Sequence, residues 1–162
     1  MNEHISLLAN KYRDRGLLLD TVLFVLLLYG SYDRKLIGVD KRLKQYAPED
    51  LQTLVLFINF FKKLVTTPNI LTEVSNLSGH LSKTELPIEF VRRIAVVDEE
   101  YCPSIDACKS EIFKVVGLTD SAIAEIAEGK YLVLTDDFRL VGQLEKQKID
   151  VLNFNHVRVL NW

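Results

Sequence analysis

Short apolar stretches alternate with longer segments of mixed polarity along this chain. Residues 16–19, 64–66, 131–135 and 150–154 predict strands, and the unbroken apolar run 16–19 is typical of a strand covered on both faces. The longer segments predict helices at residues 3–13, 21–29, 48–61, 67–77, 84–101, 119–127 and 136–147. This alternation favours a three-layer α/β/α fold with a central parallel sheet.

A few residues set the expected ends of these helices. Gly30 is suited to the C-terminus of the helix at 21–29, and Thr119 is suited to the N-cap of the helix at 119–127. The acidic run 98–100 is interpreted as the solvated end of the helix at 84–101.

Size and charge change this picture in two respects. The chain has 162 residues, 48% of them hydrophobic, so we expect a single domain over residues 1–162, with the helix at 3–13 as an N-terminal addition. The formal net charge of −2 gives no general attraction to nucleic acid. Any contact with a polyanion must therefore come from a local basic patch or from bound cations.

The chain carries no sequence signal for a membrane or for secretion. The apolar stretch 17–29 contains Asp20 and is shorter than the ~20 residues that a membrane-spanning helix needs. The first residues lack the basic start and the cleavage site of a secretory signal. Cys102 and Cys108 do not have zinc-site spacing and are interpreted as reduced thiols. We therefore expect a cytoplasmic protein with no membrane partner.

Carboxylates stand at the ends of two predicted strands. Asp20 follows the strand at 16–19, and Asp136 and Asp137 follow the strand at 131–135. The carboxyl ends of parallel strands meet at one edge of a sheet, which is where open α/β sheets bind ligands. Mg²⁺ prefers oxygen ligands and takes one or two direct carboxylates. The pattern therefore favours metal-assisted hydrolysis of a phosphodiester.

Two further acids are expected near the same edge. Glu73 lies in a predicted helix that begins just beyond a strand, and Asp120 lies in the first turn of the helix at 119–127. Each has a simpler interpretation. Glu73 suits a solvated helix position, and Asp120 suits the positive end of a helix dipole, which is worth about 0.3–1 kcal/mol.

Taken together, these segments resemble the acidic motifs of the PIN-domain family. The resemblance is carried by Asp20-Thr21 after 17–19, Glu73 within 67–74, Asp120 within 120–124, and Thr135-Asp136-Asp137 within 134–138. It spans residues 17–154, and the four motifs in this order are more specific than any one of them.

The resemblance implies a Mg²⁺- or Mn²⁺-dependent endoribonuclease. Asp20, Glu73, Asp120 and Asp137 would be its catalytic residues, and the same acids together with Asp136 would hold one or two metal ions. RNA is the implied substrate. The family includes toxins of toxin–antitoxin pairs, so an antitoxin protein is an implied partner. A homodimer is expected from the family and from the apolar content of the helix near 51–61.

One position departs from the family pattern. The family commonly has Asp-Thr-Asn at the first motif, and here Val22 stands where the asparagine would be. The asparagine would steady the site by hydrogen bonding. The alternative function is therefore a catalytically impaired PIN-like domain that binds RNA or a protein.

Other chemistries fit the order of residues less well. A response-regulator receiver needs its acidic pair early, whereas here the pair comes late. A haloacid-dehalogenase phosphatase needs Asp-x-Asp after its first strand, where this chain has Asp20-Thr21-Val22. The three histidines form no arrangement for nucleophilic catalysis.

Basic residues are the expected contacts for RNA phosphates. The first choices are Arg139, which follows the acidic pair, and Lys62 and Lys63. Further candidates are Arg34, Lys35, Arg92 and Arg93. Solvated surface charge is the simpler interpretation for each of them.

Overall fold

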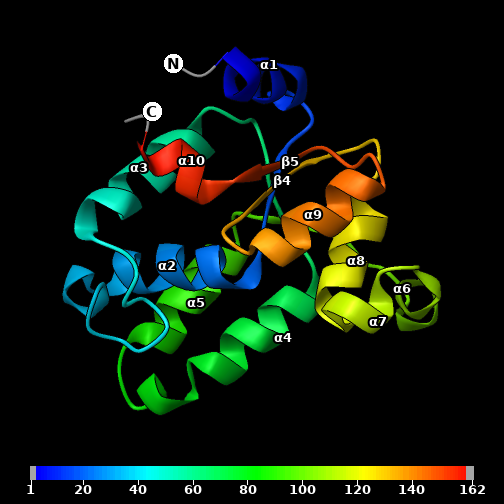
Figure 1. The fold of residues 1–162 in the computed structure, drawn as a ribbon. Coiled ribbons are helices and arrows are strands. Elements are labelled where there is room, and N and C mark those ends of the chain that lie inside the picture. The colour runs from blue at the N-terminus through cyan, green and yellow to red at the C-terminus, as the bar shows by residue number, and fades with distance from the viewer. Residues whose placement is uncertain (1–2, 160–162) are drawn as a thin grey trace.

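The computed structural model describes residues 3–159 and contains a five-stranded, all-parallel sheet (Figure 1). Its strands are β1 (Leu17–Leu19), β2 (Leu64–Thr66), β3 (Asp98–Glu99), β4 (Leu132–Thr135) and β5 (Val151–Asn153), in the order β3-β2-β1-β4-β5. Helices flank the sheet on both sides, which confirms the predicted three-layer α/β/α fold with a central parallel sheet.

The helices follow the strands along the chain. The first half of the chain contains α1 (Glu3–Tyr12), α2 (Thr21–Tyr32), the 3-10 turn η1 (Arg34–Leu36), α3 (Pro48–Asn59), α4 (Pro68–Leu77), the turn η2 (Gly79–Leu81) and α5 (Leu86–Ile94). The second half contains α6 (Ser104–Lys109), α7 (Phe113–Val116), α8 (Leu118–Ala127), α9 (Phe138–Lys146) and α10 (Phe154–Val159).

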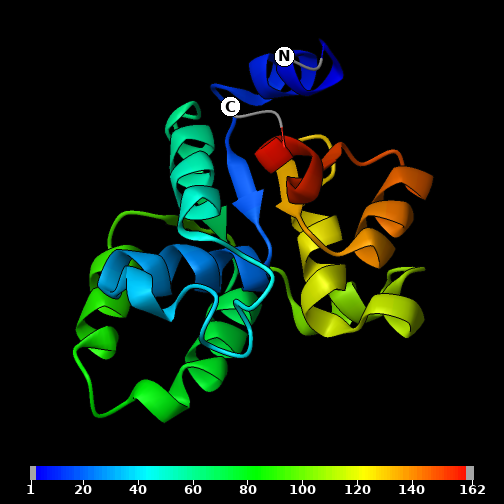
Figure 2. The same cartoon turned by 60° about the vertical axis from the view of Figure 1, so that its left-hand side comes forward.

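Figure 2 shows α2 to α5 on one side of the strands and α8 and α9 on the other. Helix α2 lies at the centre of its layer, in contact with α3, α4 and α5. Nearly every residue from Leu23 to Gly30 is fully buried, as expected for a helix that is apolar on all faces. At the opposite end of the sheet, Lys11 and Tyr12 of α1 both donate hydrogen bonds to Asp150, which precedes β5.

The order of the strands defines where a ligand would bind. The chain passes from β1 outward through β2 to β3 and then returns to place β4 on the other side of β1. The crevice outside the carboxyl ends of β1 and β4 is therefore the switch point of the sheet. Asp20 follows β1 directly, and Asp136 follows β4 directly.

The predicted helix at 84–101 is wrong in its second half. Helix α5 ends at Ile94, and residues 98–99 form the edge strand β3, paired with Val65 and Thr66 of β2. The acidic run is therefore an edge strand and not a solvated helix end. Charged side chains suit this place, because they discourage a second chain from pairing with the open edge.

Other element ends also differ from the prediction. Helix α2 continues past Gly30 to Tyr32, and α8 begins at Leu118 with Gly117 as its N-cap, so Thr119 is not the cap. Gly117 has a φ of 87°, a conformation that favours glycine. Helix α10, which follows β5, has no counterpart in the predicted elements. Among the described residues, every helix is too short or too polar to cross a membrane.

Gly30 is required for the contact between α2 and α3. A Cβ atom at this position would lie 2.5 Å from Leu51 of α3, whereas a Cβ at Gly142 of α9 would meet no atom within 4 Å. We expect Gly30→Ala to lower the free energy of unfolding by about 1–3 kcal/mol through overpacking. The matched Gly142→Ala should raise it by about 0.5–1 kcal/mol through helix propensity. Urea denaturation checks both, and equal gains for the two variants would contradict the close contact.

Candidate functional site

Asp20 is the buried centre of the acidic edge. It is the N-cap of α2, where its Oδ1 accepts a hydrogen bond of 2.9 Å from the backbone N–H of Leu23. Its Oδ2 accepts a hydrogen bond from the hydroxyl of Thr135, the last residue of β4. The side chain thus joins the carboxyl ends of β1 and β4, and the residue is only 5% exposed.

Asp136 and Asp137 extend the site from the end of β4. Asp136 accepts a hydrogen bond from the hydroxyl of Tyr46, a buried residue from the segment before α3. Asp137 is the N-cap of α9 and accepts hydrogen bonds from the N–H groups of Arg139 (2.7 Å) and Leu140 (3.3 Å). Asp137 therefore stabilises the start of α9 as well as standing among the predicted acids.

Glu73 projects from α4 and connects two other segments. Its Oε2 accepts a hydrogen bond of 2.8 Å from the hydroxyl of Thr21, next to Asp20. Its Oε1 accepts a hydrogen bond of 2.5 Å from the hydroxyl of Thr119, next to Asp120. Glu73, for which a solvated helix position was the simpler interpretation, thus accepts a hydrogen bond at each carboxylate oxygen from a residue next to another acid.

The acids influence one another electrostatically. Burial raises the pKa of Asp20 to about 7, the charge of Asp136 and more weakly that of Asp120 add to the rise, and the hydrogen bonds from Thr135 and Leu23 oppose it. Burial also raises the pKa of Asp120 to about 6, with contributions from Asp137 and Glu73. All five predicted acids therefore lie close enough to act on at least one other.

The acids do not form a ready-made cage for an ion. Within residues 3–159, no three Asp, Glu, His or Cys side chains are gathered closely enough to hold a metal ion as they stand. The hydrogen bonds explain this spacing, because Asp20, Glu73, Asp136 and Asp137 each face a donor from the protein. Unscreened carboxylates that share a crevice also repel one another.

The predicted basic contacts are divided between the two ends of the sheet. Arg139 lies at the acidic edge, where its charge opposes the rise in the pKa of Asp120. Lys62 and Lys63 precede β2 and lie at the amino ends of the strands, where they pair with Asp14 (2.8 Å) and Asp98 (3.5 Å). The structure therefore brings Arg139 to the acids and places the two lysines at the opposite edge.

The further basic candidates also have positions away from the acids. Arg93 of α5 donates to Ser31 and pairs with Glu89, which Arg92 also faces. Arg34 and Lys35 form the exposed turn η1 after α2.

Tyr46 and the three threonines are the site residues that the sequence did not identify. Each threonine stands directly beside an identified acid in the sequence: Thr21, Thr119 and Thr135. This adjacency was the signal that could have identified them as site residues. Tyr46 lies far from every acidic motif in the chain and had no such signal. Val22, the departure from the family pattern, is partly buried against the core in the first turn of α2.

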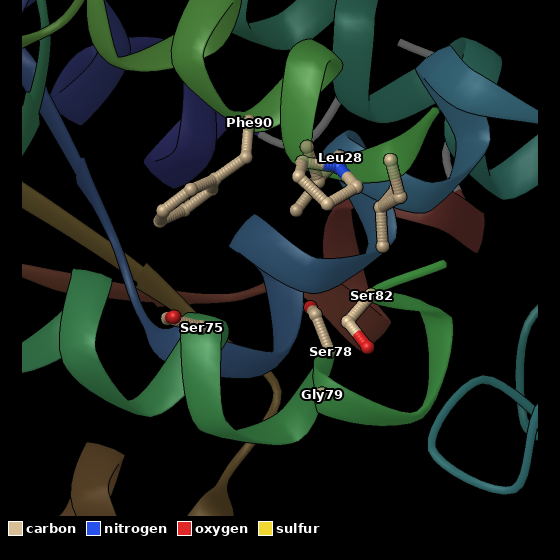
Figure 3. A pocket seen from close by; sticks show the side chains of 8 residues that line it. Leu28, Ser75, Ser78, Gly79, Ser82 and Phe90 are labelled. Atoms are coloured by element: carbon tan, nitrogen blue, oxygen red, sulfur yellow. The ribbon is translucent and has the colours of Figure 1, made fainter. Parts of the chain in front are cut away.

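A separate pocket lies between α2, α4 and α5 (Figure 3). It is formed by Leu28 of α2, Ser75 and Ser78 near the end of α4, and Phe90 of α5. Ser75 follows Glu73 by two residues and so lies on a different face of the helix. This pocket is not part of the acidic edge.

Comparison of the chain with models of known protein families, with curated proteins and with solved structures finds no match in any of the three. Function is therefore inferred from the chemistry of the acidic edge.

Asp20→Asn tests the electrostatic cost of the site. The raised pKa means that folded Asp20 holds its proton between about pH 4 and pH 7 while the unfolded carboxyl loses it, so the Asp20 carboxyl lowers stability as pH rises through this window. Asn has no charge to bury. We expect Asp20→Asn to be more stable than wild type above pH 7, by as much as about 4 kcal/mol, and to lose this advantage towards pH 4.

Asp150→Asn provides a control of opposite sign. Burial would raise the pKa of Asp150, but the hydrogen bonds from Lys11 and Tyr12 lower it below its usual value. This substitution should cost stability at neutral pH, and the cost should shrink in acid. Thermal denaturation from about pH 2 to pH 8 measures both variants, since the Asp150 effect is lost only below the ordinary carboxyl pKa near 4. A gain for Asp20→Asn that is the same at every pH would rule out the buried charge as its cause.

Proposed function

We propose that this chain is a divalent-metal-dependent endoribonuclease of the PIN-domain type. The observation that carries the proposal is the convergence of five carboxylates, from the ends of β1 and β4, from α4 and from the start of α8, on the switch point of a parallel sheet. Their order along the chain is that of the four acidic motifs of the family. The proposal goes beyond the fold, which many unrelated activities share.

The donor set suits a hard cation. All five side chains offer carboxylate oxygens, and burial, together with the charge of neighbouring acids, raises the pKa values of Asp20 and Asp120. Mg²⁺ binds through one or two direct carboxylates and completes its shell with waters, so a site for it does not require three gathered side chains. The residues present therefore fit Mg²⁺ or Mn²⁺.

The side chains divide the work as follows. Asp20, Glu73, Asp120 and Asp137 would hold the cation or cations, with Asp136 beside them. A bound cation of this kind lowers the pKa of a water and neutralises charge on the phosphate and leaving oxygen. Thr135 orients Asp20 by its hydrogen bond, and Thr21 and Thr119 orient Glu73. Arg139 is the candidate contact for an RNA phosphate, because it lies beside Asp120.

The biological setting is part of the same proposal. A role as the toxin of a toxin–antitoxin pair, an antitoxin partner, a homodimer and a cytoplasmic location all rest on the family resemblance. Only part of the apolar content of α3, the helix expected to supply a dimer surface, is accessible. Leu51, Leu54 and Phe57 of α3 are buried within the protomer, whereas Leu56 is half exposed.

The alternative is a PIN-like domain with impaired catalysis that binds RNA or a protein. Val22 favours it, since an apolar residue stands in place of the family's asparagine and cannot steady a ligand by hydrogen bonding. The existing bonds of the acids to Thr135, Tyr46 and Thr21 also favour it, because they occupy oxygens that a cation would use.

Asp120→Asn tests catalysis directly. The substitution keeps the size of the side chain but removes a charge that a hard cation needs, so cleavage of a single-stranded RNA in Mg²⁺ or Mn²⁺ should fall by at least about 10²-fold. The control is Asp106→Asn, since Asp106 also stands in the first turn of a helix, α6, but pairs with Lys109 outside the site. Gel assays with Mg²⁺, Mn²⁺ or EDTA give the rates. Equal rates for the two variants would contradict a role for Asp120.

Val22→Asn decides between the enzyme and its alternative. Asn at this position restores the residue that the family commonly carries, so the activity of an enzyme should stay equal or rise. The opposite outcome has two parts: wild type cleaves none of a panel of structured and single-stranded RNAs, and Val22→Asn cleaves at least one of them. That result would identify the natural chain as a catalytically impaired domain. The same gel assay measures both.

A further inference from the structure

Tyr46 reaches the acidic edge from a segment that carries none of the five predicted acids. The residue lies in the connection between η1 and α3 and is only 3% exposed. Its hydroxyl donates a hydrogen bond to Oδ2 of Asp136, directly after β4. A phenol keeps its proton at neutral pH, so the tyrosine is the donor and the carboxylate is the acceptor. The simpler interpretation of this bond is that a buried hydroxyl needs a partner.

Helix α10 holds the Tyr46 ring in place. The ring centroid lies 6.2 Å from that of Phe154, and the guanidinium carbon of Arg158 lies 5.7 Å from the Tyr46 ring centroid. Arg158 also donates hydrogen bonds to the backbone carbonyl of Gln45 (3.0 Å) and to the carboxylate of Asp50 (3.1 Å). These contacts fix both the ring and the backbone beside it. The direction of the hydroxyl is therefore set by α10 as well as by Asp136.

Asp136 is held at two points, and one of its carboxylate oxygens is left over. Tyr46 bonds Oδ2, and the side-chain amide of Asn155 in α10 donates a hydrogen bond of 3.4 Å to the backbone carbonyl of Asp136. Within residues 3–159, Oδ1 of Asp136 accepts no hydrogen bond. Asp20 and Glu73 differ, since hydrogen bonds engage both oxygens of each. A carboxylate that is fixed in direction but keeps a free oxygen is suited to bind a cation.

We propose that Tyr46 is a positioning residue for the divalent cation: its hydroxyl holds Oδ2 of Asp136 and leaves Oδ1 as the oxygen that binds the ion. This inference rests on the proposed function for the identity of the cation and adds a residue to the same site. The charge of Asp136 contributes to the rise in the pKa of Asp20, which places Asp136 among the acids. Tyr46 does not touch the ion. Partners that orient a metal ligand in this way are worth about 10- to 100-fold in metal affinity.

Binding of Mn²⁺ alone tests the proposal without RNA or cleavage. Tyr46→Phe keeps the ring and removes only the hydroxyl, so isothermal titration calorimetry should give an Mn²⁺ affinity about 10- to 100-fold below that of wild type. Tyr12→Phe is the matched control. Tyr12 is also 3% exposed and also donates to an aspartate, Asp150 (2.8 Å), but at the opposite end of the sheet. This control should bind Mn²⁺ as wild type does.

A second substitution tests whether Tyr46 acts through Asp136. Asp136→Asn removes the charge that Mn²⁺ needs but keeps an oxygen for the tyrosine, so it should weaken Mn²⁺ binding at least as much as Tyr46→Phe does. The double variant should then bind Mn²⁺ no more weakly than Asp136→Asn alone, because the hydroxyl has lost the ligand it orients. Thermal denaturation without metal shows which variants are folded, and Asp136→Asn decides the proposal if Tyr46→Phe is not.

The outcomes separate this inference from the nuclease. If wild type binds Mn²⁺ and either Tyr46→Phe or Asp136→Asn binds it equally well, the role of Tyr46 is overturned and the nuclease still stands. Additive losses in the double variant would also overturn that role, since Tyr46 would then act by another route. Wild type that binds no Mn²⁺ would overturn both proposals.

Discussion

The hydrogen bond from Thr135 to Asp20 is the interaction on which the rest of the site depends. It joins the ends of the two strands that flank the switch point, and it involves the residue that caps the buried helix α2. Because Asp20 is almost fully buried, each oxygen needs a donor, and Thr135 and Leu23 supply them. One carboxyl group thus fixes the start of α2 and lies in the path of any ligand that enters the crevice.

This arrangement places fold stability and chemistry in opposition. Burial and the charge of Asp136 disfavour the ionised form of Asp20, so ionisation of this carboxyl lowers the stability of the fold. Strained or unfavourable groups of this kind concentrate at functional sites, although ion-pair networks also produce them. The threonines that bond Asp20 and Glu73 limit the cost and fix the directions of both side chains.

The sequence predicted the layers of the fold, and it indicated that Asp20 and Asp136 follow neighbouring strands at one edge, because both follow from local patterns. Unbroken apolar runs such as Leu17 to Leu19 identify buried parallel strands, and parallel strands bring the residues that follow them to one edge. It could not predict β3, because Asp98 and Glu99 form a strand only through pairing with Val65 and Thr66. Tyr46 was missed for the same reason, since its bond to Asp136 spans 90 residues and leaves no local pattern. Gly30 was interpreted as a helix end because glycine is common there. Its actual role, a close contact with Leu51 of α3, leaves no signature in the sequence.

The position of β1 has a consequence for how the chain is made. Strand β1 ends at Leu19, and its partner β2 begins 45 residues later, at Leu64. Its other partner, β4, begins only at Leu132. During synthesis from the N-terminus, the central strand therefore has one unpaired edge until nearly the whole chain has been made. Contacts between residues so far apart slow folding, and an unpaired strand edge can pair with another chain. The central strand of the finished sheet therefore keeps an unpaired edge until β4 has been made, and during that time the edge can pair with another chain.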